Sequence, residues 1–226
     1  MRTDRVDVVG LLQEEVEALM VELGEPAYRG RQLFQWVQVY RAVDPATMSN
    51  LPRVLRDRLA ERVTVSRPET VRVQRSQDGT RKHLLRLADG EEIESVLIPD
   101  DGRLTACIST QVGCPLACRF CLTGLMGLRR NLAAGEIVGQ VLALQDHLAQ
   151  AERLSNIVLM GMGEPLLNFP QVKRALRILC DEHGANFSPR RITLSTAGHV
   201  PGIQELASSD PGVNLAVSLS ATTDEV

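Results

Sequence analysis

The spacing of apolar residues in the first part of the chain predicts helices. Residues 9–23, 30–39 and 51–63 carry apolar side chains at intervals of three or four positions, with charged residues between them. Gly24 and Pro26 follow the first of these segments and end it, because glycine and proline disfavour a continuing helix. We therefore expect a small all-helical domain over residues 1–65.

From residue 69 the apolar residues follow a period close to two, which is typical of strands. They occur at Val71, Val73, Leu85, Leu87, Ile93, Val96 and Ile98. Asp-Gly pairs at 78–79 and 89–90 are typical of tight turns between antiparallel strands. The pattern predicts a short antiparallel β connector over residues 66–100.

Strands and helices alternate over the rest of the chain, residues 101–226. The expected strands are 104–109, 156–162, 191–195 and 214–219, and the expected helices are 134–149, 171–183 and 201–208. This alternation is typical of right-handed βαβ units and a parallel sheet, whose ligands bind at the carboxyl ends of the strands. The fold class is therefore α/β, a four-stranded portion of a β/α barrel. A closed barrel needs more strands and the last strand would be an uncovered edge, so we expect a truncated form of a longer protein.

Composition narrows the class of protein. The 226 residues are 44% hydrophobic, enough for a full core, with no run of about 18 apolar residues that could span a membrane. Charges throughout the first 20 residues are unlike a secretory signal, so we expect a cytoplasmic protein. Net charge is −3, yet residues 28–86 hold 13 Lys or Arg against 5 Asp or Glu. This stretch could contact phosphates, although on charge alone we favour an ordinary solvated surface.

The cysteines are the main chemical signal. Four of the five fall within residues 107–121, and Cys114, Cys118 and Cys121 form the pattern C-x3-C-x2-C. Three such close thiolates cannot all pair as disulfides, but they can bind one metal centre. A [4Fe–4S] cluster normally takes four cysteines, so three would leave one iron open for another ligand. The alternative is a four-cysteine zinc site that includes Cys107, of which only one arm has typical zinc spacing.

Several motifs follow one another in a specific order. They are LGEPAYRGRQLFQW near the N-terminus, GCPLACRFC, the R-N-L of residues 130–132, MGMGEPLLN, ITLSTAG and SLSA. Over essentially the whole chain they resemble the RlmN/Cfr family of radical S-adenosylmethionine (SAM) RNA methyltransferases. The resemblance implies a radical-SAM β/α barrel, preceded by a helical domain of RNA-recognition type at 1–65 and the β connector.

The resemblance also implies an activity and partners. The expected enzyme methylates C2 of adenosine in 23S ribosomal RNA and transfer RNA, using a [4Fe–4S] cluster and SAM. The expected partners are those RNAs and a flavodoxin-like electron donor, with no membrane contact and a monomeric state. Methylation at C8 is the alternative within the family. A zinc-stabilised, non-catalytic RNA-binding protein is the alternative outside it.

Roles for single residues follow from the matching motif positions. Cys114, Cys118 and Cys121 would ligate the cluster. Gly163 and Glu164 would bind the amino-acid end of SAM, since a carboxylate can accept from an ammonium group and glycine permits close backbone approach. The next two strand ends would complete the SAM site with Ser195, Ser218, Leu219 and Ser220. Family members usually have SLHA where this chain has SLSA, so Ser220 is a departure.

Two further residues match catalytic positions of the family. Cys107 matches a thiol that resolves a protein–RNA thioether, and Glu94 matches a carboxylate that handles the C2 proton. The resemblance places a methyl-carrying cysteine in a C-terminal segment beyond residue 226. We therefore expect the 226-residue chain to bind a cluster but not to complete methyl transfer.

Overall fold

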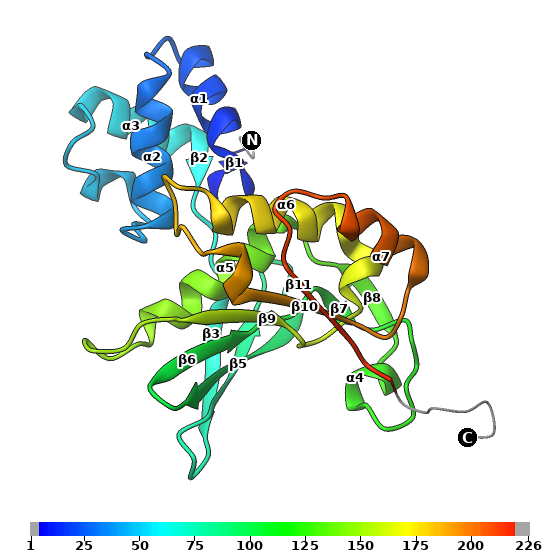
Figure 1. Cartoon of the computed structure of the whole chain (residues 1–226). Helices are drawn as coiled ribbons and strands as arrows, with labels where there is room; N and C mark the ends of the chain where they lie inside the picture. The colour runs from blue at the N-terminus through cyan, green and yellow to red at the C-terminus, as the bar shows by residue number, and fades with distance from the viewer. Residues whose placement is uncertain (1–4, 220–226) are drawn as a thin grey trace.

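The computed structural model describes residues 5–219 (Figure 1). The α-helices are α1 (Gln13–Glu22), α2 (Tyr28–Gln38), α3 (Arg53–Arg62), α4 (Leu122–Leu125), α5 (Ala134–Asp146), α6 (Phe169–Cys180) and α7 (Val200–Ala207). Short 3-10 helices are η1 (Val8–Gly10), η2 (Pro45–Thr47), η3 (Pro165–Asn168) and η4 (Pro189–Arg191). The strands are β1 (Val6–Asp7), β2 (Val63–Thr64), β3 (Glu69–Arg75), β4 (Arg81–Arg86), β5 (Glu92–Asp100), β6 (Arg103–Cys107), β7 (Gln111–Gly113), β8 (Leu128–Asn131), β9 (Asn156–Leu159), β10 (Ile192–Thr196) and β11 (Asn214–Val217).

Helices α1 to α3 form a lobe at the top of Figure 1, and the three predicted helices are confirmed. Leu33 and Phe34 of α2 are buried in it. Helices α1 and α2 approach so closely at Gly30 that a Cβ there would lie 2.4 Å from the Cα of Glu17. The helical spacing did not predict the short parallel pair β1–β2 that joins the two ends of the lobe.

One seven-stranded sheet runs through the rest of the molecule, in the order β11-β10-β9-β6-β5-β4-β3. Strands β6, β9, β10 and β11 are parallel, and β3, β4, β5 and β6 are antiparallel neighbours. Both the antiparallel segment and the four parallel strands are therefore confirmed. The sheet continues through β5 into β6 without a break, so the expected connector is part of the same sheet as the barrel strands. The boundaries at residues 65 and 100 stay a prediction.

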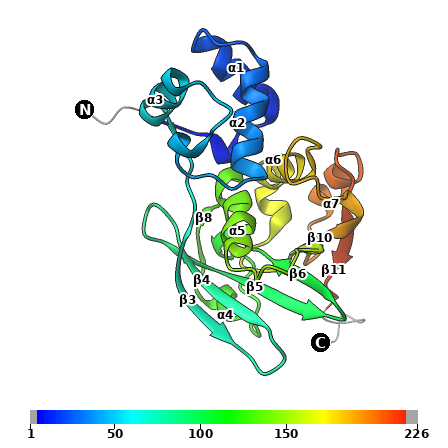
Figure 2. The same ribbon diagram turned by 90° about the vertical axis from the view of Figure 1, so that its left-hand side faces the viewer.

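The two faces of this sheet differ. Ile93, Ser95 and Leu97 on β5 are fully buried, and the Ser95 hydroxyl donates to Gln140 of α5 at 2.8 Å. Side chains alternate along a strand, so Glu94 and its same-face neighbours lie on the opposite face, which we call the open face. Figure 2 shows α5 and α6 together on one side of the sheet.

Helices α5 and α6 supply most of the apolar cover of the sheet. The buried side chains of α5 include Ile137, Val138, Val141 and Leu142, and those of α6 include Val172, Leu176 and Leu179. Their recurrence at three and four residues is what the sequence pattern predicted for both helices. Among the described residues, no helix combines the length and apolar character needed to cross a membrane.

Candidate functional site

The carboxyl ends of the parallel strands open into one pocket of about 360 Å³. The loop after β6, the loop after β9 and the ends of β10 and β11 all contribute to it. Its lining includes Cys114, Cys118, Cys121, Gly163, Glu164, Ser195 and Ser218. Residues predicted from separate motifs are thus neighbours in space, at the edge of the sheet where a parallel α/β fold binds its ligands.

The loop that carries the three cysteines is held at its base by an antiparallel pair, β7 and β8. Gln111 pairs with Asn131, and Val112 with Arg130. At the end of β7, Gly113 has φ +76°, and a Cβ there would lie 1.8 Å from the carbonyl oxygen of Gly127. Only glycine permits this contact between the two sides of the loop.

All five cysteines are free thiols. The backbone N–H groups of Gly124 and Thr123 lower the pKa of the Cys121 thiol, whereas burial raises the pKa of Cys114. Across residues 5–219, no three Cys, His, Asp or Glu side chains converge closely enough to hold a metal ion. The three thiols therefore share a pocket without being drawn together into ligand geometry.

Glu164 joins two loops of the pocket. Its side chain is 3% exposed, and its Oε1 accepts from the N–H of Leu166 at 3.1 Å. Its Oε2 accepts from the N–H of Ala197, after β10, at 2.9 Å. The carboxylate still has lone pairs for a further donor, because an ionised carboxylate has about four acceptor sites.

A close contact within the protein leaves room only for glycine at position 163. It has φ +99°, and a Cβ there would lie 2.6 Å from the Cβ of Gln111. The Gln111 amide accepts from the N–H of Glu164 at 2.8 Å and donates to the Oδ1 of Asn131 at 2.7 Å. The R-N-L segment therefore supports the loop after β9 from behind. Its Arg130 forms ion pairs with Glu136 and Asp89, both at 2.7 Å.

The remaining predicted SAM residues lie at the ends of β10 and β11. The hydroxyl oxygens of Ser195 and Ser218 are 3.5 Å apart. Leu219 is 75% exposed and is not among the residues that line the pocket. Ser220 lies outside the described residues.

Cys107 and Glu94 lie on the open face, outside the cysteine pocket. Cys107 ends β6, pairs with Val96, and is 8% exposed; burial raises the pKa of its thiol. Glu94 is two residues from Val96 on the same face, and its Oε1 lies 2.8 Å from the Nζ of Lys82. Glu94 is a diagonal neighbour of Cys107 across the two strands.

Cys180, predicted to be a core thiol, is half-buried at the end of α6. Burial raises the pKa of this thiol to about 11, which makes it a poor nucleophile or ligand at neutral pH. It lies apart from the cysteine loop and contributes to the apolar core.

Sequence reasoning missed a buried polar network beneath the pocket. Gln140 of α5 is fully buried; its Oε1 accepts from the Ser95 hydroxyl and the Ser109 N–H, and its Nε2 donates to the Ser109 carbonyl. The Ser109 hydroxyl in turn accepts from the N–H of Met162. The network fixes the starts of the loops after β6 and β9. A polar residue within the apolar stretch of α5 was the signal that could have found it.

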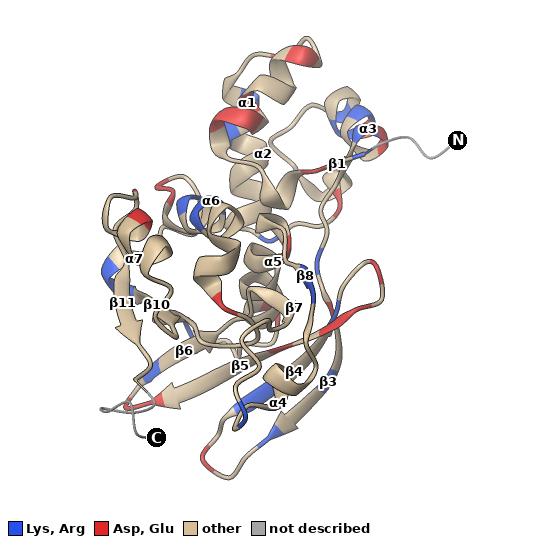
Figure 3. Cartoon of the chain, turned by 90° about the vertical axis from the view of Figure 1, so that its right-hand side faces the viewer, with Lys and Arg blue, Asp and Glu red and all other residues tan. Residues whose placement is uncertain are grey.

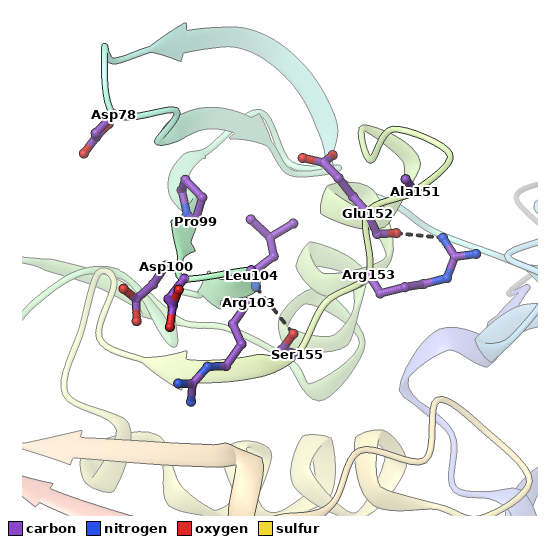
Figure 4. Close-up of a pocket in the computed structure, with 11 residues that line it drawn as sticks. Asp78, Pro99, Asp100, Arg103, Leu104, Ala151, Glu152, Arg153 and Ser155 are labelled. Atoms are coloured by element: carbon purple, nitrogen blue, oxygen red, sulfur yellow. Dashed lines mark hydrogen bonds between the residues drawn. The ribbon is translucent and has the colours of Figure 1, made fainter.

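A second, larger cavity of about 510 Å³ lies at the opposite end of the strands (Figure 4). It is bordered by the β5–β6 turn, with Asp100 and Arg103, and by Arg153 and Ser155 before β9. Figure 4 shows the Ser155 hydroxyl accepting from the N–H of Leu104, at 3.4 Å. This cavity lies at the amino ends of β6 and β9, away from the predicted site residues that the structure describes.

Comparison with known proteins agrees with this geometry. Residues 6–65 match the family described as "Ribosomal RNA large subunit methyltransferase N-terminal domain", and residues 108–226 match the "Radical SAM superfamily". The chain is 51% identical to "Dual-specificity RNA methyltransferase RlmN" of Rhodospirillum rubrum, covering 98% of this chain and 53% of the relative. It is 46% identical to the protein of the same name from Syntrophus aciditrophicus, covering 100% of this chain and 65% of that one.

A solved structure is similar as well. The crystal structure of a radical SAM methyltransferase from Sphaerobacter thermophilus superposes with a TM-score of 0.90 at 46% identity, over 96% of this chain and 64% of that chain. This chain thus spans between about half and two thirds of the length of these relatives. It belongs to the radical SAM superfamily and, within it, is similar along its whole length to the RlmN methyltransferases.

Proposed function

We propose that this chain carries the RNA-recognition region and the cluster-binding half of a radical SAM methyltransferase that modifies C2 of adenosine in 23S ribosomal RNA and transfer RNA. One observation carries the proposal. The three cysteines share a pocket with the strand ends after β9, β10 and β11, where the family resemblance expects SAM. The similarity to RlmN proteins, which are named dual-specificity RNA methyltransferases, supports the RNA substrates.

The chemistry of the donor set fits an iron–sulfur cluster. Three free thiols line the pocket, and soft thiolates favour iron–sulfur clusters over hard cations such as Mg²⁺. Cys114, Cys118 and Cys121 would hold the cluster, in the pocket that Glu164 and Ser195 also line. When bound, the cluster and SAM would supply the 5′-deoxyadenosyl radical.

The other residues of the chain would hold and position the ligands. Glu164 would accept from the SAM ammonium group through its spare lone pairs while it joins the two loops. Cys107 would resolve the protein–RNA thioether, and its raised pKa would keep it a neutral thiol until a base activates it. Glu94, on the same face, would handle the C2 proton. The flavodoxin-like electron donor, the monomeric state and the cytoplasmic location stay predictions.

Anaerobic reconstitution with iron and sulfide tests the proposal. The 226-residue chain should bind about four irons and four sulfides, with a visible spectrum that changes when SAM is added. Cys118→Ala should lower the iron content. Cys180→Ala, which removes a thiol of the core, should not.

A colourless protein with one equivalent of zinc would favour the zinc-stabilised RNA-binding alternative and contradict the cluster. Regiochemistry needs a separate measurement on an enzyme that contains the rest of the barrel. Mass spectrometry of the digested RNA should find 2-methyladenosine; 8-methyladenosine would favour the C8 alternative.

A further inference from the structure

The row of side chains that contains Cys107 extends across the open face to the far edge of the sheet. Cys107 pairs with Val96, Val96 with Lys82, and Lys82 with Gln74. Paired residues lie on the same face of a sheet and neighbouring strands are about 4.8 Å apart, so Lys82 lies about 10 Å from Cys107. The neighbouring row runs through Arg72, Leu84 and Glu94.

These two rows border a small pocket between β3, β4 and β5. Its volume is about 150 Å³, and it is lined by Arg72, Gln74, Lys82, Leu84 and Glu94. We propose that Arg72, Gln74 and Lys82, which we call the β3–β4 cradle, bind a backbone phosphate of the RNA substrate next to the target adenosine. This inference rests on the proposed RNA methyltransferase function and adds to it a place for the RNA backbone.

The charges of the cradle suit an anion. Arg72 is exposed on the edge strand β3, and among residues 5–219 it has no ion-pair partner. Its guanidinium group is therefore available for a bidentate contact with a phosphate. Lys82 is half-exposed and forms an ion pair with Glu94, with 2.8 Å between the Lys82 Nζ and the Glu94 Oε1. The amide of Gln74 adds an uncharged donor beside them.

The arrangement couples RNA binding to Glu94. A phosphate in the cradle competes with the Glu94 carboxylate for Lys82, since both are anions within reach of the same ammonium group. The carboxylate then loses its partner on the face that also carries Cys107. Substrate binding would thus release the group that the proposed mechanism uses as a base, at the moment when its substrate is present.

A phosphodiester is favoured over an acidic protein for two reasons. The cradle is a single small pocket, matched to one phosphate group, and only two cations line it. It also lies on the same face as the two proposed catalytic residues, where a nucleotide must be held. An acidic protein partner would need a broad surface with many cations, as in other electrostatically complementary interfaces.

Fluorescence anisotropy of a labelled RNA hairpin with an adenosine in its loop, titrated with the 226-residue chain at 50–200 mM KCl, tests the cradle. Arg72→Gln and Lys82→Gln should each weaken binding several-fold and reduce the slope of log K against log [KCl] by about 0.7 to 0.9. Glu94→Gln should act in the opposite direction and strengthen binding, because it removes a competing anion.

Arg103→Gln is the matched control, since Arg103 is an exposed arginine on the same sheet but at the cavity of Figure 4. The cradle is contradicted if this variant weakens binding as much as Arg72→Gln, if the cradle variants bind like the wild type, or if the wild type binds no RNA. Stronger binding of polyglutamate than of RNA would assign the surface to an acidic protein instead.

Iron content of the same samples separates the two proposals. If the chain assembles its cluster but the Arg72 and Lys82 variants bind RNA as tightly as the wild type, the cradle is contradicted and the proposed function is not. A chain that binds RNA through the cradle but assembles no cluster contradicts the proposed function alone.

Discussion

The carboxylate of Glu164 accepts the backbone N–H of Ala197 at 2.9 Å and so connects the loops after β9 and β10. Its second oxygen accepts the N–H of Leu166. Glu164 is therefore part of the framework of the pocket, independently of any ligand that it binds. A measurement of stability therefore tests the role of Glu164 in the framework, separately from any measurement of ligand binding.

Replacing Glu164 by alanine should destabilise the fold. The substitution leaves two backbone N–H groups at the pocket without their acceptor, and a buried donor without a partner costs about 1–3 kcal/mol. We expect the free energy of unfolding in urea to fall by about 2 kcal/mol or more. Glu182→Ala is the control, because the Glu182 side chain is 84% exposed. Equal effects of the two variants would contradict a framework role.

Replacing Gln140 by alanine should destabilise the fold, although Gln140 does not itself line the pocket. The change removes the partners of the Ser95 hydroxyl and of both backbone groups of Ser109. We expect a loss of about 2–4 kcal/mol in urea unfolding. Hydrogen exchange of the Ser109 and Met162 amides should become faster. Gln145→Ala, on the same helix but half-buried, should change both quantities little; a Gln140 variant as stable as this control would rule the network out as a support.

Gly30→Ala should separate α1 from α2. The new Cβ would lie 2.4 Å from the Cα of Glu17, a backbone atom that cannot move without shifting the helix. Overpacking of this kind costs about 1–3 kcal/mol, more than the gain in helix propensity of alanine over glycine. Thermal unfolding should show a lower midpoint for this variant. Gly212→Ala, where a Cβ meets no atom of residues 5–219 within 4 Å, should leave the midpoint unchanged.

His83 should make the fold sensitive to mild acid. The ring is fully buried next to His147, with 5.0 Å between ring centroids, and neither ring nitrogen has a hydrogen-bond partner among residues 5–219. Burial, with His147, Arg81 and Arg75 nearby, lowers its pKa from 6.5 to about 4. The unfolded chain therefore binds a proton between these two pH values that the folded chain does not. Stability should be constant with respect to this group above pH 6.5 and fall towards pH 4, by at most about 1.4 kcal/mol per pH unit.

Urea unfolding at several pH values between 4 and 7 measures this dependence. His83→Phe should flatten the curve over that range, because the phenyl ring fills the site and cannot take up a proton. Gln145→Ala, which changes no ionisable group, should keep the pH dependence of the wild type. A steep acid dependence in His83→Phe would assign it to other groups.

Much of the fold could be predicted from periodicity. The apolar spacing in α1 to α3, α5 and α6 located the helices, and the β/α alternation correctly placed the motifs at one edge of a parallel sheet. The continuation of the antiparallel strands into the same sheet could not be predicted. Pairing of Val96 with Cys107 is a contact between strands whose apolar patterns are equally compatible with separate sheets.

The candidate site, like the fold, could be predicted only in part from the sequence. Resemblance and spacing selected the cysteines, Gly163 and Glu164, and the pocket brings them together. For some of the predicted residues, the contacts in the structure differ from those expected from the sequence. The close approach at Gly163 is made by Gln111, and the Glu94 carboxylate is paired with Lys82 from the neighbouring strand. Such partners come from other strands and depend on register, which no local pattern encodes.

The contact of Gly113 with the carbonyl of Gly127 has a consequence for how the cysteine loop can respond to its ligand. The loop is closed at its neck by main-chain atoms, and further along it the Cys121 N–H donates to the Cys118 carbonyl at 3.0 Å. The neck therefore fixes the register of β7 and β8 independently of what the three sulfurs would bind. Residues between the two glycines, other than the three cysteines and the closely packed Gly124, can also be exchanged by design, for example to alter how solvent reaches the pocket, without disturbing the sheet.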